Sequence, residues 1–164
     1  MTLSPSKIRK LLLAHKQWQE HYLIAGYGHE GRGCRLEIHG SELAGADLQD
    51  TFLADANLQD ADLRGTILNY SCFHRADLRR ADLRGTDFRW SSFQSAKMQD
   101  VDLRGADLRD AEFLNTDLRG AKLVNNIRTC RTFHGAKFTA DALPWLILHP
   151  RWAVMKDTVQ IEPI

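Results

Sequence analysis

The stretch DVDLRGADLRDAEFLNTDLRGAKL, residues 100–123, places a large apolar residue at every fifth position. A period of five matches neither the alternation of a half-buried strand nor the 3.6-residue period of a helix. The residue two positions before each large one is small or β-branched, and residues two apart lie on the same side of an extended backbone. Each five-residue unit therefore directs one large and one smaller side chain inward and then turns.

The five-residue period extends far beyond this stretch. Counted by fives, the large positions are Ile38, Leu43, Leu48, Leu53, Leu58, Leu63, Leu68, Phe73, Leu78, Leu83, Phe88, Phe93, Met98, Leu103, Leu108, Phe113, Leu118 and Leu123. The other positions of each unit are mostly polar, with Gly or Asp common at the turn. A chain that turns a corner every five residues and stacks its coils is a solenoid.

The A(D/N)Lxx pattern resembles the pentapeptide-repeat protein family over 18 consecutive units, residues 36–125, and continues in phase through Phe133 and Phe138 after a weak unit at residues 126–130. The resemblance implies an all-β solenoid, a right-handed quadrilateral parallel β-helix with four units in each coil. DLRG recurs every twenty residues at 62–65, 82–85 and 102–105, which agrees with a twenty-residue coil. A further DLRG at 117–120 breaks that spacing.

The flanks of the repeat predict two terminal segments. Residues 1–35 hold an amphipathic helix from Pro5 to about Ile24, with Ser4 as its N-cap, and then a Gly-rich linker. Residues 36–140 form the β-helix. Residues 141–164 form an apolar segment, partly helical, with a last strand expected at 158–161. This segment either caps the last coil or joins two rods end to end, so the protein is a monomer or a homodimer; the candidate contacts are Trp145, Leu146, Leu148 and Trp152.

Composition indicates a folded chain without a membrane span. Of the 164 residues, 43% are hydrophobic and 26% are charged, and the longest apolar stretch is far shorter than the roughly 18 residues of a membrane helix. The three cysteines are widely spaced and form no CxxC pair, which argues against disulfides and zinc and favours the cytoplasm. Residues 36–125 hold 16 acidic and 11 basic residues, a charge of −5 against +6 on the flanks.

No motif in the sequence indicates catalysis. The GxGxxG match at Gly26–Gly31 follows a predicted helix, whereas a dinucleotide site needs a strand before the loop. Cys72 and His74 share one wall but lack a third group that would complete a nucleophile or metal site. A convex rod also has no enclosed pocket for a carboxylate pair. We therefore expect a protein without enzymatic activity, bound metal or cofactor.

Outward positions that depart from the repeat supply the candidate site. Ile67 replaces the usual Asp or Asn, as does Phe52, and Tyr70 and Trp90 occupy turn positions usually held by Gly or Asp. Because Tyr70 and Trp90 are twenty residues apart, they should stack at one corner. The candidate partner-binding residues are Ile67, Tyr70, Arg89 and Trp90, the composition of a protein-binding hot spot. Alternatively, the aromatic residues only cover the adjoining turn.

The function predicted from these features is that of a non-catalytic protein–protein interaction module with an unidentified protein partner. The resemblance adds an alternative, because some family members mimic DNA and protect a type II topoisomerase, DNA gyrase or topoisomerase IV, from inhibitors or toxins. Mimicry requires a strongly negative surface, and here arginines interrupt the acidic rows. Direct nucleic-acid binding is not expected, because the sequence predicts no coherent basic stripe.

Overall fold

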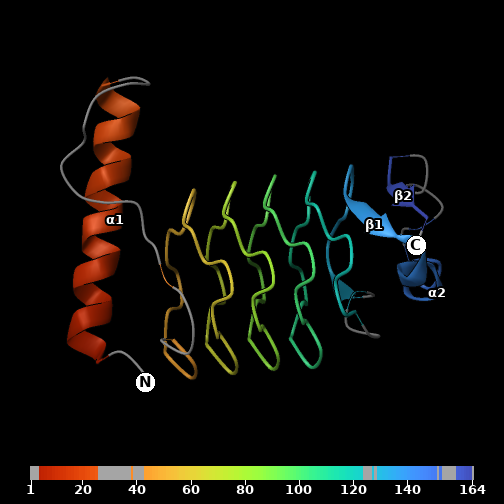
Figure 1. Ribbon diagram of the computed structural model, residues 1–164, viewed down its shortest axis with the longest axis horizontal. Helices are drawn as coiled ribbons and strands as arrows, with labels where there is room; N and C mark the ends of the chain where they lie inside the picture. Colours follow the sequence, from red (N-terminus) through yellow and green to blue (C-terminus); the bar gives the residue numbers. More distant parts are fainter. Residues whose placement is uncertain are drawn as a thin grey trace.

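The computed structural model describes residues 4–25, 38, 43–123, 127, 129–150, 152 and 158–163, and within the first helix the side chains of residues 6–17. The elements are helix α1 (Pro5–Ala25), strand β1 (Lys137–Thr139), 3₁₀ helix η2 (Ala140–Ala142), helix α2 (Leu143–Leu146) and strand β2 (Gln160–Glu162). Figure 1 shows a rod of stacked coils with α1 at one end and β2 and α2 at the other. The Gly26–Gly31 motif and the expected boundary at residues 35/36 lie outside the described residues.

Parallel backbone bridges join residues twenty apart throughout the rod, from Asp47↔Ile67 to Asp117↔Lys137. Four five-residue units therefore complete one coil, as the repeat predicts. Each side of a coil contributes a single bridging residue, which lies just before a buried large residue. Because each side forms only a single-residue bridge to the next coil, most sides are too short to count as β-strands.

The corners explain why the repeat is five residues long. From Leu43 to Leu118, the backbone two residues after each large residue has a positive φ, for example 63° at Gly65 and 59° at Asp110. This left-handed conformation suits Gly and is tolerated by Asp and Asn, the residues that dominate the turn position of the sequence. The amide two residues past the large one then bonds to the next coil, as Gly65 N does to Arg84 O at 3.0 Å.

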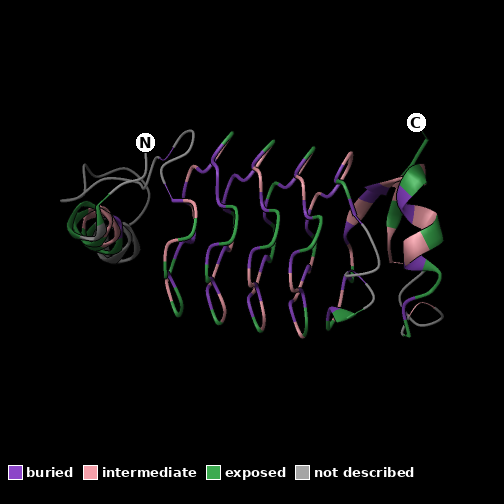
Figure 2. Ribbon diagram, turned by 90° about the horizontal axis from the view of Figure 1, so that it is seen from below, coloured by how far each residue is buried: buried purple, intermediate pink, exposed green. Residues whose placement is uncertain are grey.

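The core is a column of large side chains on each of the four sides. Leu58, Leu63, Leu68 and Phe73 are all fully buried, and Figure 2 shows buried residues recurring along every coil. The hydroxyl residues among the small positions are satisfied by backbone groups; Ser91 Oγ, for example, donates to Leu68 O at 2.7 Å. The interior thus contains few polar atoms and each of these hydroxyls has a partner.

In the weak unit at residues 126–130, Ile127 is fully buried and Cys130 is buried. Arg128, which the five-residue period selects as the inward residue, lies outside the described residues. Phe133 and Phe138 are fully buried again, so the period resumes on the next two sides. The rod therefore continues past the weak unit.

Helix α1 begins where the N-cap signal indicates, with Lys7 N donating to Ser4 O at 2.9 Å. Ile8, Leu11 and Leu12 are half-buried against the hydrophobic core, and His15 is fully buried. Leu13 faces away and is 57% exposed. The described helices include none with both the length and the apolarity needed to cross a lipid bilayer.

At the other end, β2 lies parallel to β1, with Phe138 opposite Ile161, and Gln160 N donates to Ala136 O at 2.9 Å. This strand begins two residues later than the expected 158–161. Among the candidate terminal contacts, Leu146 is buried, Trp145 and Trp152 are half-buried against the core, and Leu148 is 49% exposed. Leu148 is therefore the member of this set with the most apolar surface open to solvent.

Candidate functional site

Tyr70 and Trp90 stack at one corner of the rod, as their spacing predicts. Their ring centroids are 6.4 Å apart, the planes differ by only 5°, and the residues are 60% and 52% exposed. Asp50 and Asp110 occupy the same corner on the coils before and after them. We call these four residues, Asp50, Tyr70, Trp90 and Asp110, the aromatic corner.

The backbone at the aromatic corner does not favour aromatic residues. Tyr70 and Trp90 both have a φ of 61°, a left-handed conformation that costs an L-residue about 1–2 kcal/mol. At the preceding corner the chain uses Gly45, Gly65, Gly85 and Gly105 on successive coils, which we call the glycine corner. Because glycine adopts this conformation without strain, turn geometry alone gives no reason for large rings at Tyr70 and Trp90.

Ile67 and Arg89 lie on the side of the coil that leads into the aromatic corner. Ile67 is 41% exposed and bridges to Asp87 on the next coil. The Arg89 guanidinium is held by Asp87 through two hydrogen bonds of 2.9 and 2.7 Å. Past the corner, Phe52 is 52% exposed. The structure thus groups the predicted residues around one corner, with Arg89 already engaged by a carboxylate.

Paired Asp and Arg side chains cover much of the remaining surface. Within each DLR unit the arginine reaches back over the leucine to the aspartate; Arg104 Nε and Nη2 donate to Asp102 at 2.8 and 2.6 Å. The arginine hydrogen bonds hold the pKa of Asp102 below its ordinary value. The same pairing occurs at Asp62–Arg64, Asp77–Arg79, Asp82–Arg84, Asp87–Arg89, Asp107–Arg109 and Asp117–Arg119.

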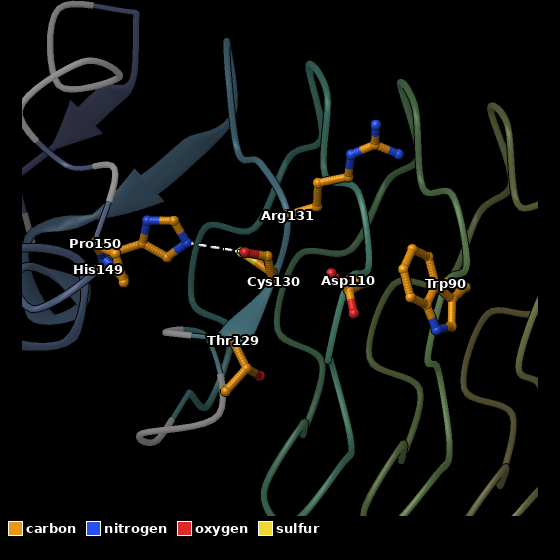
Figure 3. A pocket seen from close by; sticks show the side chains of 7 residues that line it. All are labelled: Trp90, Asp110, Thr129, Cys130, Arg131, His149 and Pro150. Carbon is orange, nitrogen blue, oxygen red and sulfur yellow. Dashed lines mark hydrogen bonds between the residues drawn. The ribbon is translucent and has the colours of Figure 1, made fainter.

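An open pocket of about 530 Å³ adjoins the aromatic corner. Its lining comes from the repeat and from the C-terminal segment: Trp90, Asp110, Thr129, Cys130, Arg131, His149 and Pro150. Figure 3 shows Trp90 and His149 on opposite sides, with Asp110 and Cys130 between them. The His149 ring is buried, with Nε2 3.0 Å from Cys130 O. His149 thereby joins the C-terminal segment to the weak unit at residues 126–130.

The described cysteines do not have the environment of nucleophiles. Burial raises the pKa of the Cys130 thiol to about 12, so it remains protonated at neutral pH. Burial also raises the pKa of Cys72, and the neighbouring His74 has Nε2 3.0 Å from Ser92 Oγ. Within the described residues, no group of three or more His, Cys, Asp or Glu is arranged to hold a metal ion.

The pocket contains residues that the sequence prediction missed. Asp110 is twenty residues after Trp90, so the repeat itself places it beside that ring, and this signal was present in the sequence. His149 and Pro150 lie beyond the repeat and have no register from which their position follows. Whether these two residues line the pocket depends on how the C-terminal segment folds back onto the end of the repeat.

The stacked twenty-residue coils make this chain a β-helical repeat protein. The aromatic corner is an exception to the regular pattern of side chains on its surface. The pentapeptide-repeat family model matches in eight copies, at residues 41–80, 71–110 and 86–125. These matches cover more than half of the chain, and the chain belongs to the pentapeptide-repeat family, as the sequence resemblance predicted. No curated protein matches the chain.

Several solved structures are similar to this chain. A pentapeptide repeat protein of the Arabidopsis thaliana thylakoid lumen is 21% identical, with 64% of this chain and 77% of that chain covered and a TM-score of 0.55, which supports the β-helical fold alone. A pentapeptide repeat protein of Nostoc PCC 7120 is 32% identical over 71% of this chain and 84% of that one, with a TM-score of 0.47.

Rfr23, a pentapeptide repeat protein of the cyanobacterium Cyanothece 51142, is 30% identical, with a TM-score of 0.48. The match covers 49% of this chain and 55% of Rfr23, so this chain spans little more than half of that protein's length. These similarities carry no assignment of a partner.

Proposed function

We propose that this chain is a non-catalytic protein–protein interaction module that binds its partner through the aromatic corner. One observation carries the proposal: two large aromatic rings lie stacked and more than half exposed at turn positions where the backbone favours glycine. Exposed aromatic residues flanked by apolar side chains are typical of interface hot spots. Ile67 and Phe52 extend the apolar surface to the two sides of the corner.

In this proposal the two terminal segments act as caps. A β-helix exposes unpaired backbone groups at each end, which invites edge-to-edge association. Helix α1 packs apolar residues against the core, and β2 pairs with β1 on the last coil. Covering both ends leaves the sides of the rod for recognition. The protein is then a monomer, with end-to-end dimerisation through Leu148 and its neighbours as the alternative.

The charge on the surface of the rod makes protection of a topoisomerase a weaker proposal than binding through the aromatic corner. A surface that mimics DNA needs a continuous row of unpaired negative charges. Here the carboxylates of the DLR units are held by arginines at 2.6–2.7 Å. These pairs bring much of the surface of the rod close to neutrality, which favours recognition by side-chain shape and stacking over imitation of a phosphate backbone.

The test is affinity capture from a lysate of the source organism with three immobilised forms: the native protein, Tyr70→Ser/Trp90→Ser, and Leu13→Ser. Leu13 is as exposed as the two aromatic residues but lies on α1, so it controls for loss of any surface apolar residue. We expect a protein retained by the native and Leu13→Ser forms and lost by the double variant. Equal retention by all three forms contradicts the proposal.

The double variant must also remain folded. Removing the two rings should leave the melting temperature nearly unchanged, because both side chains are more than half exposed and substitutions of such surface residues change stability little. A large loss of stability would mean that the aromatic corner is structural. Retention of gyrase or topoisomerase IV subunits would identify the partner as the alternative one.

A further inference from the structure

The aromatic corner carries two carboxylates and no arginine, whereas each of the next two corners carries an arginine. At the next corner Arg75 donates to Asp55 at 2.8 and 2.6 Å, and at the one after it Arg80 donates to Asp60 at 2.7 Å through both nitrogens. At the aromatic corner, the residue following Asp50 on the next coil is Tyr70 rather than arginine. Within the part of the chain that the structure describes, the carboxylates of Asp50 and Asp110 have no ion pair.

Three described arginines close to the aromatic corner are already neutralised. Arg89 is paired with Asp87 at 2.7 Å, Arg109 with Asp107 at 2.6 Å and Arg131 with Glu112 at 2.8 Å. Each pair contributes no net charge. Asp50 and Asp110 therefore give this corner a local excess of negative charge on both sides of two stacked rings.

The pocket beside Trp90 has the shape and chemistry to receive a cationic side chain. Trp90 and Asp110 both line it, and it is open to solvent. The face of an indole ring attracts a guanidinium or ammonium group, most strongly where water is partly excluded. A carboxylate beside that ring adds an ion pair, so a single guest cation can be held by both residues.

We propose that the partner segment bound by the aromatic corner is an extended basic peptide with two cationic side chains four residues apart. This inference rests on the proposed function and names the chemistry of its partner. Asp50 and Asp110 are three coils apart, roughly 15 Å at the strand spacing. Residues i and i+4 of an extended chain are about 13 Å apart. The intervening residue i+2 then lies over the Tyr70 and Trp90 rings.

The probe is the peptide acetyl-Arg-Ala-Leu-Ala-Arg-amide, titrated into ¹⁵N-labelled full-length protein while the indole Nε1–H signal of Trp90 is followed. Trp90→Ser identifies that signal. Two control peptides are matched to the probe: one has citrulline, the neutral isostere of arginine, at both ends, and the other places its two arginines side by side. The matched protein variant is Asp50→Asn/Asp110→Asn, which removes no ion pair between residues that the structure describes and retains residues that tolerate the left-handed turn.

We expect the spaced dication to shift the Trp90 signal with a dissociation constant of about 1 mM. The citrulline peptide, which loses both the cation–π and the ionic contacts, should bind about tenfold more weakly. The Asp50→Asn/Asp110→Asn variant, which loses only the ionic contacts, should bind the spaced peptide severalfold more weakly. The peptide with adjacent arginines should bind severalfold more weakly than the spaced one, because it reaches only one of the two carboxylates.

Equal binding of the citrulline peptide, no effect of Asp50→Asn/Asp110→Asn, or no binding at millimolar concentration overturns the inference. Concentration-dependent dimerisation that the same variant abolishes also overturns it, because a second copy of the chain is then the occupant. Capture of a lysate protein that is lost with Tyr70→Ser/Trp90→Ser but kept with Asp50→Asn/Asp110→Asn leaves the interaction-module function standing and removes only the basic-peptide assignment.

Discussion

Two ladders of stacked aromatic rings run along this rod, one inside and one outside. The inner ladder, Phe73, Phe93 and Phe113, is fully buried, with ring centroids 4.9 Å apart at both steps. The outer ladder, Tyr70 and Trp90, is more than half exposed, with centroids 6.4 Å apart. The inner spacing equals the distance between hydrogen-bonded strands, about 4.8 Å. The inner rings hold the coils together, whereas the outer rings sit on a turn that would be less strained without them.

Replacing one ring in each ladder gives the largest contrast. We expect Phe93→Ala to lower the free energy of unfolding by about 3–5 kcal/mol, because it leaves a cavity between two stacked rings. Trp90→Asn should change it by less than about 1 kcal/mol, since lost stacking is offset by relief of the left-handed strain. Urea denaturation followed by circular dichroism measures both. Similar losses for the two variants would show that the outer ladder is also structural.

The claim that large residues strain the corners can be tested at the glycine corner. Gly85 has a φ of 67°, and a Cβ added there would meet no atom within 4 Å. Gly85→Val should therefore cost about 2 kcal/mol through backbone strain alone, whereas Gly85→Asn should cost under about 1 kcal/mol. Urea midpoints give the comparison. A neutral Gly85→Val would remove the strain argument from Tyr70 and Trp90.

The smallest expected effect separates the paired carboxylates from those at the aromatic corner. Asp102→Asn should cost about 0.5 kcal/mol at pH 7, the amount of a partly exposed ion pair, while Asp110→Asn should be neutral. The folded-state pKa of Asp102 is lowered, so its contribution is present above the unfolded value of about 3.9 and is lost as the pH falls through the folded value. The difference between the variants should shrink as the pH falls below about 3.9; a difference that stays constant down to acid unfolding would contradict the ion-pair explanation.

Most of the rod could be predicted from the sequence because one rule applies to every unit. The large position of each unit from Leu43 to Leu123 is buried, and the twenty-residue coil appears in the bridges. The rule is less informative at residues 126–130, where Ile127 is fully buried one position before the one that the five-residue period selects. Counting by fives does not predict this, because it takes no account of the type of side chain.

The candidate site also has one part that the sequence predicts and another that it does not. The stacking of Tyr70 on Trp90 follows from their spacing, and Asp110 follows from it too. The pocket does not, because His149 and Pro150 reach it through a C-terminal segment without a repeat. His149 packs edge-on against Phe133, with centroids 4.7 Å apart, and lies beside Cys130. Contacts of this kind join residues whose relation appears only in the folded chain.

The four-unit coil also limits how such a surface can change by duplication or loss of repeats. Inserting one five-residue unit between Trp90 and Asp110 would turn every later side chain by a quarter of a revolution about the rod axis and move Asp110 to another corner. Inserting four units would keep every corner aligned and only lengthen the rod by one coil, about 4.8 Å. Surfaces that span several coils can therefore be inherited intact through steps of twenty residues, whereas steps of five would rearrange them.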